Sequence, residues 1–170
     1  MSKTIYFKGK PITLAGRNLK TGENAPDFRV VSADLKEFTL SDFNSSFKLI
    51  TTFPSLDTPV CDLQVKEFNR KSTEFSPELV VIGVSKDLPF AQKRFCNNND
   101  IKGILLFSDY KYSSFGINYG LLIKELNRDN YFGQERYSAL YTGCRRVKRR
   151  SGLYRCLREL GKSAKNPLDD

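Results

Sequence analysis

The sequence predicts an α/β protein in which helices flank a central β-sheet, with a β-hairpin at the N-terminus. Apolar, β-branched runs at residues 47–53, 79–85 and 104–108 are typical of strands buried on both faces. The segments between them carry apolar residues at helical spacing. Strands that alternate with helices favour a βαβ arrangement around one sheet. At 170 residues and 39% hydrophobic content, the chain can fill one sizeable core.

The N-terminal third reads as short strands separated by turns. Residues 4–8 and 11–14 flank Gly9 and Lys10, which predicts a small hairpin. A turn-rich link over residues 21–26 precedes two further short strands, at residues 28–31 and 38–40. Residues 47–53 form the expected central strand, and Pro54 ends it because proline cannot donate to a sheet ladder.

The middle of the chain alternates helix and strand. Leu63, Val65 and Phe68 follow Cys61 at helical spacing, so we expect a helix that ends near residues 76–77. The buried strand at residues 79–85 leads to a second helix over residues 88–97. The strand at residues 104–108 comes next, and no internal repeat or low-complexity segment interrupts this order.

The composition restricts the possible chemistry. The chain contains no histidine, which excludes Ser-His-Asp and Cys-His catalysis, zinc sites with histidine ligands and histidine-held haem. Its four cysteines, none of them in a C-x-x-C pair, are Cys61, Cys96, Cys144 and Cys156. Such scattered cysteines are usually plain buried residues in a reducing compartment, and occasionally a redox pair.

Cys61 stands where a thiol becomes reactive. It lies just after the predicted central strand, in the first turn of the predicted helix, where backbone N–H groups and the helix dipole favour a thiolate. We therefore expect its pKa to lie below the free value. The hydroxyl of Thr58 can reach both the sulfur and an incoming substrate, and Pro54 would shield the sulfur from water.

A plainer interpretation of these residues exists. A lone cysteine is most often a packed small hydrophobe, and Cys96 has the same alternative. Pro54 and Thr58 can serve as a strand stop and a helix cap. The register of all three residues, Pro54-x-x-x-Thr58-x-x-Cys61, favours the functional interpretation.

Several collinear stretches resemble the peroxiredoxin family, and in particular its thiol peroxidase branch in the thioredoxin-like superfamily. The active-site pattern is Pro54-Ser55-Leu56-Asp57-Thr58-Pro59-Val60-Cys61. The resemblance covers roughly residues 3–126 and includes the hairpin and the segments at residues 25–28, 87–96, 108–110, 115–116 and 119–125. It implies a thioredoxin-like fold for this part of the chain.

The resemblance also implies an atypical two-cysteine cycle in one chain. Cys61 would attack a hydroperoxide and become a sulfenic acid, and Cys96 would then close an intramolecular Cys61–Cys96 disulfide. A thioredoxin-type reductant would restore both thiols. The family further implies a homodimer formed near the active site and no cofactor.

The C-terminal part departs from the family. We therefore divide the chain into a hairpin at residues 1–18, a peroxiredoxin domain at 19–126 and a divergent basic segment at 127–170, in which we see no clear buried strand. The family continues with an Ala-Arg-Ala-Val-Phe-like strand whose arginine helps to hold the thiolate. Codons for residues 133–138, written GGN CAR GAR CGN TAY TCN, permit that peptide when read from the third base of the glycine codon. We hypothesise a frameshift between about Glu125 and Gly133, and we assign Arg136 no role.

Two other functions remain as alternatives. Residues 127–160 carry nine basic and three acidic side chains, a net charge of +6, which fits a nucleic-acid-associated module, although a charge run is more often a solvated segment. The second alternative is that the chain is an inactive relic, a truncated peroxiredoxin scaffold with an unrelated C-terminal segment. With no further ligands near Cys144 and Cys156, we expect no zinc site. The sequence shows no apolar membrane span and no secretory h-region, so we expect a cytoplasmic protein.

Overall fold

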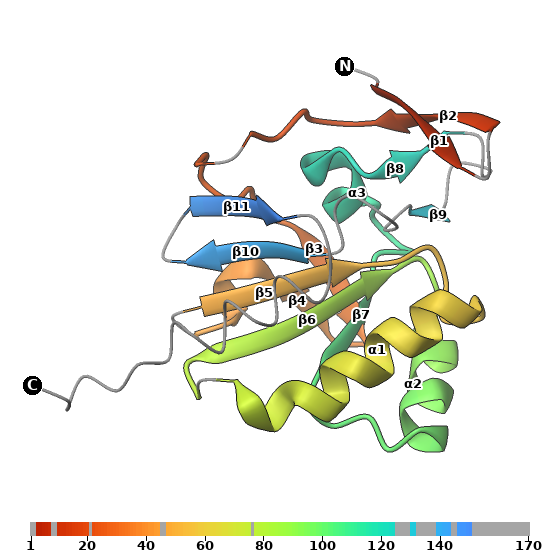
Figure 1. The fold of residues 1–170 in the computed structure, drawn as a ribbon, viewed down its shortest axis with the longest axis vertical. Coiled ribbons are helices and arrows are strands. Elements are labelled where there is room, and N and C mark those ends of the chain that lie inside the picture. The colour runs from red at the N-terminus through yellow and green to blue at the C-terminus, as the bar shows by residue number, and fades with distance from the viewer. Residues whose placement is uncertain are drawn as a thin grey trace, which may run out of the picture.

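A mixed seven-stranded sheet forms the centre of the computed structural model, which describes residues 3–7, 10–20, 22–44, 47–75, 77–124, 130–131, 139–143 and 146–150 (Figure 1). Its strands, in spatial order, are β11 (Arg146–Arg150), β10 (Ala139–Gly143), β5 (Phe47–Thr52), β6 (Leu79–Ser85), β7 (Leu105–Ser108), β3 (Arg29–Ser32) and β4 (Glu37–Thr39). The three central strands β5, β6 and β7 are parallel, and the flanking strands pair antiparallel. The predicted α/β class with a central sheet is confirmed.

The sheet is buried on both faces because neighbouring side chains of each central strand point to opposite sides. On β5, Leu49 joins one hydrophobic cluster and Ile50 joins the other. On β7, Leu106 and Phe107 divide in the same way. This explains why the central strands read as continuous apolar runs rather than as alternating ones.

Two helices accompany one of these clusters, which we call the helix-side cluster. They are α1 (Pro59–Lys71) and α2 (Pro89–Asn98), each of which follows a parallel strand and begins with a proline in its first turn. The buried members of the cluster are Leu49, Phe53, Leu56, Cys61, Val65, Phe68, Val81, Ile101, Ile104 and Leu106. Phe95 and Cys96 of α2 pack against it, half-buried.

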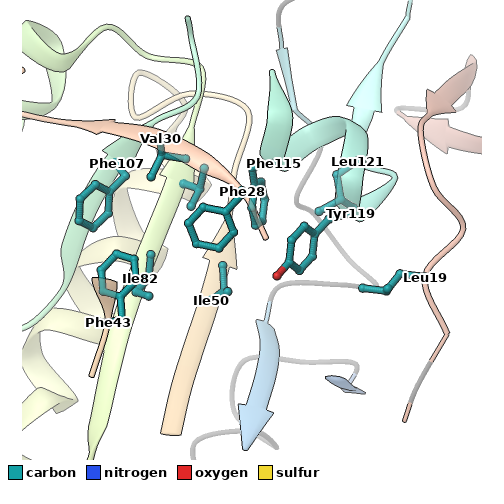
Figure 2. Packing of buried hydrophobic residues seen from close by; sticks show 11 residues of the cluster. Leu19, Phe28, Val30, Phe43, Ile50, Ile82, Phe107, Phe115, Tyr119 and Leu121 are labelled. Carbon is teal, nitrogen blue, oxygen red and sulfur yellow. The ribbon is translucent and has the colours of Figure 1, made fainter. Parts of the chain in front are cut away.

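Aromatic rings fill the opposite cluster (Figure 2). Phe28 meets Phe115 edge to face at 5.5 Å between ring centroids, and Phe115 stacks on Tyr119 at 4.5 Å. Both of these partners lie on the short helix α3 (Ser114–Tyr119). The hydroxyl of Tyr119 donates to the carbonyl oxygen of Pro26 at 2.9 Å, so its one polar atom is satisfied.

The N-terminal hairpin belongs to a second, four-stranded sheet. Strands β1 (Lys3–Phe7) and β2 (Lys10–Ala15) pair antiparallel, and β2 pairs in turn with β8 (Leu122–Ile123), which pairs with β9 (Asn130–Tyr131). Gly16, at φ 112°, follows β2 where a Cβ atom would lie 2.2 Å from the carbonyl oxygen of Ile117. Only glycine allows this close approach between the hairpin and α3. The predicted hairpin is confirmed.

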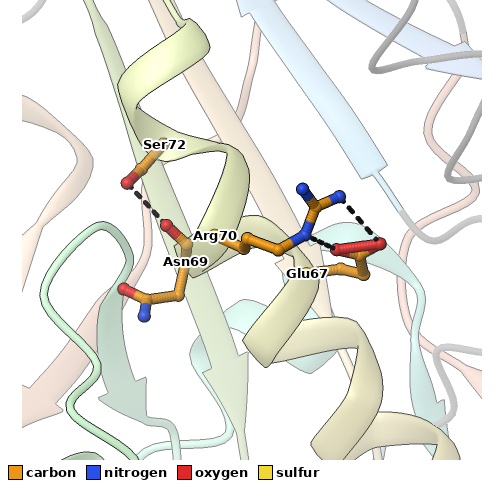
Figure 3. A network of polar contacts seen from close by, with 4 residues as sticks. All are labelled: Glu67, Asn69, Arg70 and Ser72. Carbon is orange, nitrogen blue, oxygen red and sulfur yellow. Dashed lines mark hydrogen bonds and ion pairs between the residues drawn. The ribbon is translucent and has the colours of Figure 1, made fainter.

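Two turns of 3₁₀-helix complete the described elements, η1 (Leu40–Asp42) and η2 (Ser72–Glu74). The second of them corrects the expected end of the first long helix. Regular α-helix stops at Lys71, five residues before the predicted end at 76–77, and continues only as η2. The side chain of Ser72 donates to the carbonyl oxygen of Asn69 at 2.7 Å, a contact that competes with helical continuation (Figure 3).

The sequence showed no clear buried strand beyond residue 126, but residues 139–143 form strand β10. Strand β10 pairs antiparallel with β5, with Leu140 opposite Ile50 and Gly143 opposite Phe47. Strand β5 is therefore not an open edge, and β6 and β7 lie inside the sheet, each between two partners. The basic residues 146–150 continue the sheet as β11, rather than forming a segment without regular structure.

Candidate active site

The candidate site lies on the turn that joins β5 to α1. Phe53 is fully buried directly after the strand, and Pro54 follows it where the backbone leaves the sheet. Thr58 is the N-cap residue of α1, with extended backbone angles, and Pro59 occupies the first helical position. Cys61 is the third residue of the helix. The sequence-predicted residues Pro54, Thr58 and Cys61 thus fall on one strand-to-helix turn, as expected.

Burial dominates the electrostatics of Cys61. Its side chain is 1% exposed and belongs to the helix-side cluster, and this burial raises the pKa of the Cys61 thiol. Hydrogen bonds from the Thr58 hydroxyl and from the backbone of Ser55 act in the opposite direction, while the charge of Asp87 raises the pKa further. The expectation that the helix N-terminus brings this pKa below its free value is therefore wrong, because loss of hydration outweighs the local donors.

Thr58 supplies the side-chain hydroxyl that hydrogen-bonds the sulfur. Its Oγ1 lies 3.1 Å from the carbonyl oxygen of Ser55 and also hydrogen-bonds Cys61. A hydroxyl carries a single proton, so donation to Ser55 and donation to a thiolate are alternative states. The Thr58 hydroxyl can therefore change its acceptor from the Ser55 carbonyl oxygen to the sulfur when the thiol ionises.

Asp87 anchors the turn that carries Thr58, a role that the sequence pattern did not reveal. Its Oδ1 accepts a hydrogen bond from Ser55 Oγ at 2.7 Å. Its Oδ2 accepts from Leu56 N at 2.8 Å and from Ser85 Oγ at 2.9 Å. The only available signal was its place directly after the strand parallel to β5, because parallel neighbours end at the same edge of a sheet.

The structure places the second predicted cysteine near the same core. Cys96, the eighth residue of α2, is half-buried and packs on the helix-side cluster that contains Cys61. Burial raises the pKa of the Cys96 thiol as well. Both cysteines are free thiols. A disulfide needs Cα atoms within about 7 Å, so the two thiols can pair only where the backbones that carry them come that close.

The ends of α2 are fixed by two buried or partly buried amides. Near its start, Gln92 is fully buried and its Nε2 donates to Ser85 Oγ at 3.0 Å and to the carbonyl oxygen of Phe107 at 2.9 Å. Beyond its end, the Asn69 side chain on α1 holds the loop at residues 100–103 through three hydrogen bonds. The segment that bears Cys96 therefore lies between two anchors.

Several predictions fall on residues that the structure does not describe. Cys144, Cys156 and Arg136 lie outside the described ranges, as do the codon positions of the frameshift hypothesis. Within those ranges, no three side chains of the metal-binding types gather closely enough to hold an ion. In the same part of the chain, no helix has the length and apolar character needed to cross a membrane.

Cys61 lies in the first turn of the helix that follows a central parallel strand, and Cys96 lies on the next helix, against the same hydrophobic cluster. The Redoxin family model matches residues 20–141 of the chain. A thiol peroxidase of Staphylococcus saprophyticus is 48% identical over 122 residues, which are 72% of this chain and 73% of that protein. One from Staphylococcus aureus is 44% identical over the same share.

Solved structures agree with these matches. A peroxiredoxin-like protein from Aquifex aeolicus superposes with a TM-score of 0.80 at 31% identity and covers 94% of this chain and 96% of its own. A thiol peroxidase from Chromobacterium violaceum reaches a TM-score of 0.75 at 20% identity, with 96% and 98% covered, and supports the fold alone. The chain belongs to the Redoxin family and, within it, to the thiol peroxidases. It is an enzyme of the peroxiredoxin type, as the resemblance predicted.

Proposed function

We propose that this chain reduces hydrogen peroxide and organic hydroperoxides with the Cys61 thiolate as nucleophile and Cys96 as the resolving thiol. The observation that carries this proposal is the position of Cys61 in the first turn of α1, against the Thr58 hydroxyl, with Cys96 on the same hydrophobic cluster. Pro54 ends the strand before this turn and limits the access of water. Membership of the thiol peroxidases supports the same assignment.

The first step forms a sulfur–oxygen bond and breaks the peroxide bond. The Cys61 thiolate attacks one oxygen of the hydroperoxide, which becomes the Cys61 sulfenic acid, and the other oxygen leaves as an alkoxide or hydroxide. A proton from water converts this leaving group to alcohol or water. The Thr58 hydroxyl supports the step because it can donate to the sulfur and to the peroxide oxygen in turn.

The second and third steps return the enzyme to its reduced state. The Cys96 thiol attacks the sulfenic sulfur, so that a Cys61–Cys96 disulfide forms and water leaves. A thioredoxin-type dithiol then supplies two electrons by exchange and leaves as its own disulfide. Because α2 holds Cys96 in a regular helix, the second step requires local unwinding of that helix.

Location and assembly follow from the same proposal. We place the protein in the cytoplasm, where a thioredoxin-type reductant keeps the thiols of a redox pair reduced. Exposed apolar side chains stand near the site at the starts of both helices, and support a homodimer through this surface: Val60, Leu63, Leu88 and Phe90. Light scattering of the parent beside a Phe90→Asp variant tests this, and a monomeric parent would contradict it.

A coupled assay tests the catalytic proposal. With thioredoxin, its reductase and NADPH, the parent should consume peroxide, and Cys61→Ser should consume none, because a serine hydroxyl has a far higher pKa and no base accompanies it. Turnover by Cys61→Ser comparable with the parent would reject Cys61 as nucleophile. A folded parent without any peroxide reaction would favour the relic. Steeply salt-dependent DNA binding would favour the nucleic-acid module, which the comparisons do not support.

A further inference from the structure

Asp87 joins three segments through its carboxylate and its backbone carbonyl oxygen. It accepts hydrogen bonds from the turn before α1, through Ser55 Oγ and Leu56 N, and from the end of β6, through Ser85 Oγ. Its own carbonyl oxygen accepts a hydrogen bond from Ser108 Oγ at the end of β7. The residue thus ties the ends of two parallel strands to the turn that leads into Cys61.

Through Ser55, this network reaches Thr58. The carbonyl oxygen of Ser55 accepts hydrogen bonds from Thr58 N at 3.2 Å and from Thr58 Oγ1 at 3.1 Å, and Ser55 Oγ also accepts from Asp57 N at 3.1 Å. The position of Ser55 therefore sets the position of the Thr58 hydroxyl. That hydroxyl is the donor in contact with the Cys61 sulfur.

Asp87 also begins the connection to α2. Leu88, the next residue, is the N-cap of that helix, and its carbonyl oxygen accepts hydrogen bonds from Ala91 N and Gln92 N. Fixing the Asp87 side chain therefore fixes the first turn of α2 relative to the first turn of α1. The carboxylate thus holds the turn before α1, and the same residue directly precedes the N-cap of α2, the helix that carries Cys96.

This arrangement has an electrostatic cost for the nucleophile. A negative charge near a thiol disfavours its ionisation, and Asp87 raises the pKa of Cys61 in addition to burial. The other acid beside the thiol in sequence, Asp62, is paired with Lys66 at 2.7 Å. The negative charge of Asp87 thus disfavours the Cys61 thiolate. Any benefit that Asp87 brings to the reaction therefore comes from the groups that its hydrogen bonds hold in place.

We propose that Asp87 is a positioning residue of the peroxidase reaction, which holds the Ser55–Thr58 turn and the start of α2 in register around Cys61. The inference rests on the proposed function of Cys61. A misplacement of the reacting groups by about 1 Å can lower the reaction rate about a hundredfold. The rate gained by holding these groups in place therefore exceeds the rate lost through a modestly smaller thiolate fraction. The charge of Asp87 therefore lowers the rate of the peroxide reaction, whereas its hydrogen bonds raise it. Because the two effects have opposite signs, an experiment can separate them.

The first test uses Asp87→Asn, which keeps the shape but removes the charge and one acceptor. The pH dependence of Cys61 alkylation by iodoacetamide is followed by peptide mass spectrometry in a Cys96→Ser background, and the peroxide reaction rate is measured in parallel. We expect the alkylation midpoint to move to lower pH while the peroxide rate falls about tenfold or more. A thiol that ionises more easily yet reacts more slowly is the signature of lost positioning.

Ser55→Ala and Asp62→Asn complete the experiment. Ser55→Ala breaks one of the anchoring hydrogen bonds without changing any charge, so the peroxide rate should fall while the midpoint does not move lower. Asp62→Asn removes a charge beside Cys61 that does not hold the turn, and should stay near the parent in both measurements. If Asp87→Asn fails to fold, Ser55→Ala decides alone.

Two results would overturn the inference. A peroxide rate at or above the parent's in Asp87→Asn, or in Ser55→Ala, would show that the turn needs no anchor. An unchanged alkylation midpoint in Asp87→Asn would show that Asp87 does not act on the sulfur. If the proposed function itself is wrong, the result is different. The parent would then consume no peroxide, while the alkylation midpoint would still show whether Asp87 acts on the Cys61 thiol.

Discussion

At the scale of single residues, Cys61 is held between opposing effects. Burial and the Asp87 charge raise the pKa of its thiol, and the donors at Thr58 and Ser55 lower it. None of the described groups that act on this pKa is a cation. The thiolate in this part of the chain therefore depends on hydrogen bonds, and each donor should have a measurable effect.

Thr58 gives the first prediction. Thr58→Val removes the hydroxyl but keeps the branched shape, so the pKa of Cys61 should rise and the rate of peroxide reaction should fall about a hundredfold. Thr58→Ser keeps the donor and should stay within about tenfold of the parent. Stopped-flow oxidation of the reduced enzyme measures both variants. Equal rates for the valine and serine variants would contradict a role for the hydroxyl.

From the pKa of Asp109 we predict how the free energy of unfolding depends on pH. Its side chain is 1% exposed and accepts hydrogen bonds from Phe115 N and Gly116 N at the start of α3. Burial raises the pKa of Asp109 from 3.8 to about 6. The folded chain therefore binds this proton more tightly than the unfolded chain, so the stabilisation is present at acidic pH and is lost as pH rises through about 6.

Urea unfolding of the parent and of Asp109→Asn at pH 5 and pH 7 checks this dependence. Carboxylates with lowered pKa values, such as Glu37, stay ionised across this window and add little slope. The parent should lose about 1 kcal/mol of unfolding free energy between pH 5 and pH 7, and the asparagine variant should lose almost none. Parallel pH profiles for the two proteins would refute the assignment to Asp109.

At the scale of elements, sequence reasoning worked where one local signal decided the structure. The buried strand at residues 79–85 was placed to the residue, because an unbroken apolar run has few other interpretations. The short helix α3 was missed, since its six residues are too few for a period and its aromatic rings pack on Phe28, a residue distant in the sequence. Helix α1 ended early through a side-chain contact at Ser72 that no periodicity reports.

In the candidate site, too, the residues close together in the sequence could be predicted and those brought together by the fold could not. Pro54, Thr58 and Cys61 lie within eight residues of one another, so their spacing could be recognised from the sequence. Asp87 meets the turn across 31 and 32 residues of chain, through hydrogen bonds that depend on the parallel pairing of β5 and β6. The direction of the Cys61 pKa could not be foreseen, because it depends on burial by residues from several elements.

Asn69 gives a prediction for the connection between α2 and β7. Its Oδ1 accepts from Lys102 N at 2.8 Å and from Gly103 N at 2.7 Å, and its Nδ2 donates to the carbonyl oxygen of Asp100 at 3.2 Å. Asn69→Ala should lower the unfolding free energy by about 1–3 kcal/mol, because it leaves these backbone groups without their partner. Asn69→Asp keeps both accepted bonds and should cost less. Denaturant unfolding in which the alanine variant equals the parent would contradict this.

At the scale of the whole molecule, the frameshift hypothesis remains a proposal. Strand β10 pairs with β5, so the lack of a clear strand in the sequence beyond residue 126 no longer supports the hypothesis. The missing family arginine still supports the hypothesis. Burial raises the pKa of Cys61, and a nearby cation such as that arginine would lower it. A chain with the reading frame restored after Glu125 should therefore react faster with peroxide and show a lower alkylation midpoint.

Resequencing across codons 120–140, followed by expression of both versions, checks that proposal. Melting temperature and peroxide rate are compared under the same conditions, with the alkylation midpoint of Cys61 as the electrostatic readout. Equal values in all three measurements would show that the basic segment at residues 127–170 is a legitimate replacement for the family's own ending. The hypothesis would then be wrong.

The central claim is that Cys61 and Cys96 complete one catalytic cycle within a single chain, and peptide mapping tests it most directly. The reduced enzyme receives one equivalent of peroxide and is digested under non-reducing conditions. We predict a Cys61–Cys96 disulfide within one chain, and in Cys96→Ser a Cys61 trapped as sulfenic acid and prone to further oxidation. A disulfide that instead joins Cys61 to Cys144 or Cys156, or a Cys61 left as a thiol, would contradict the proposed cycle.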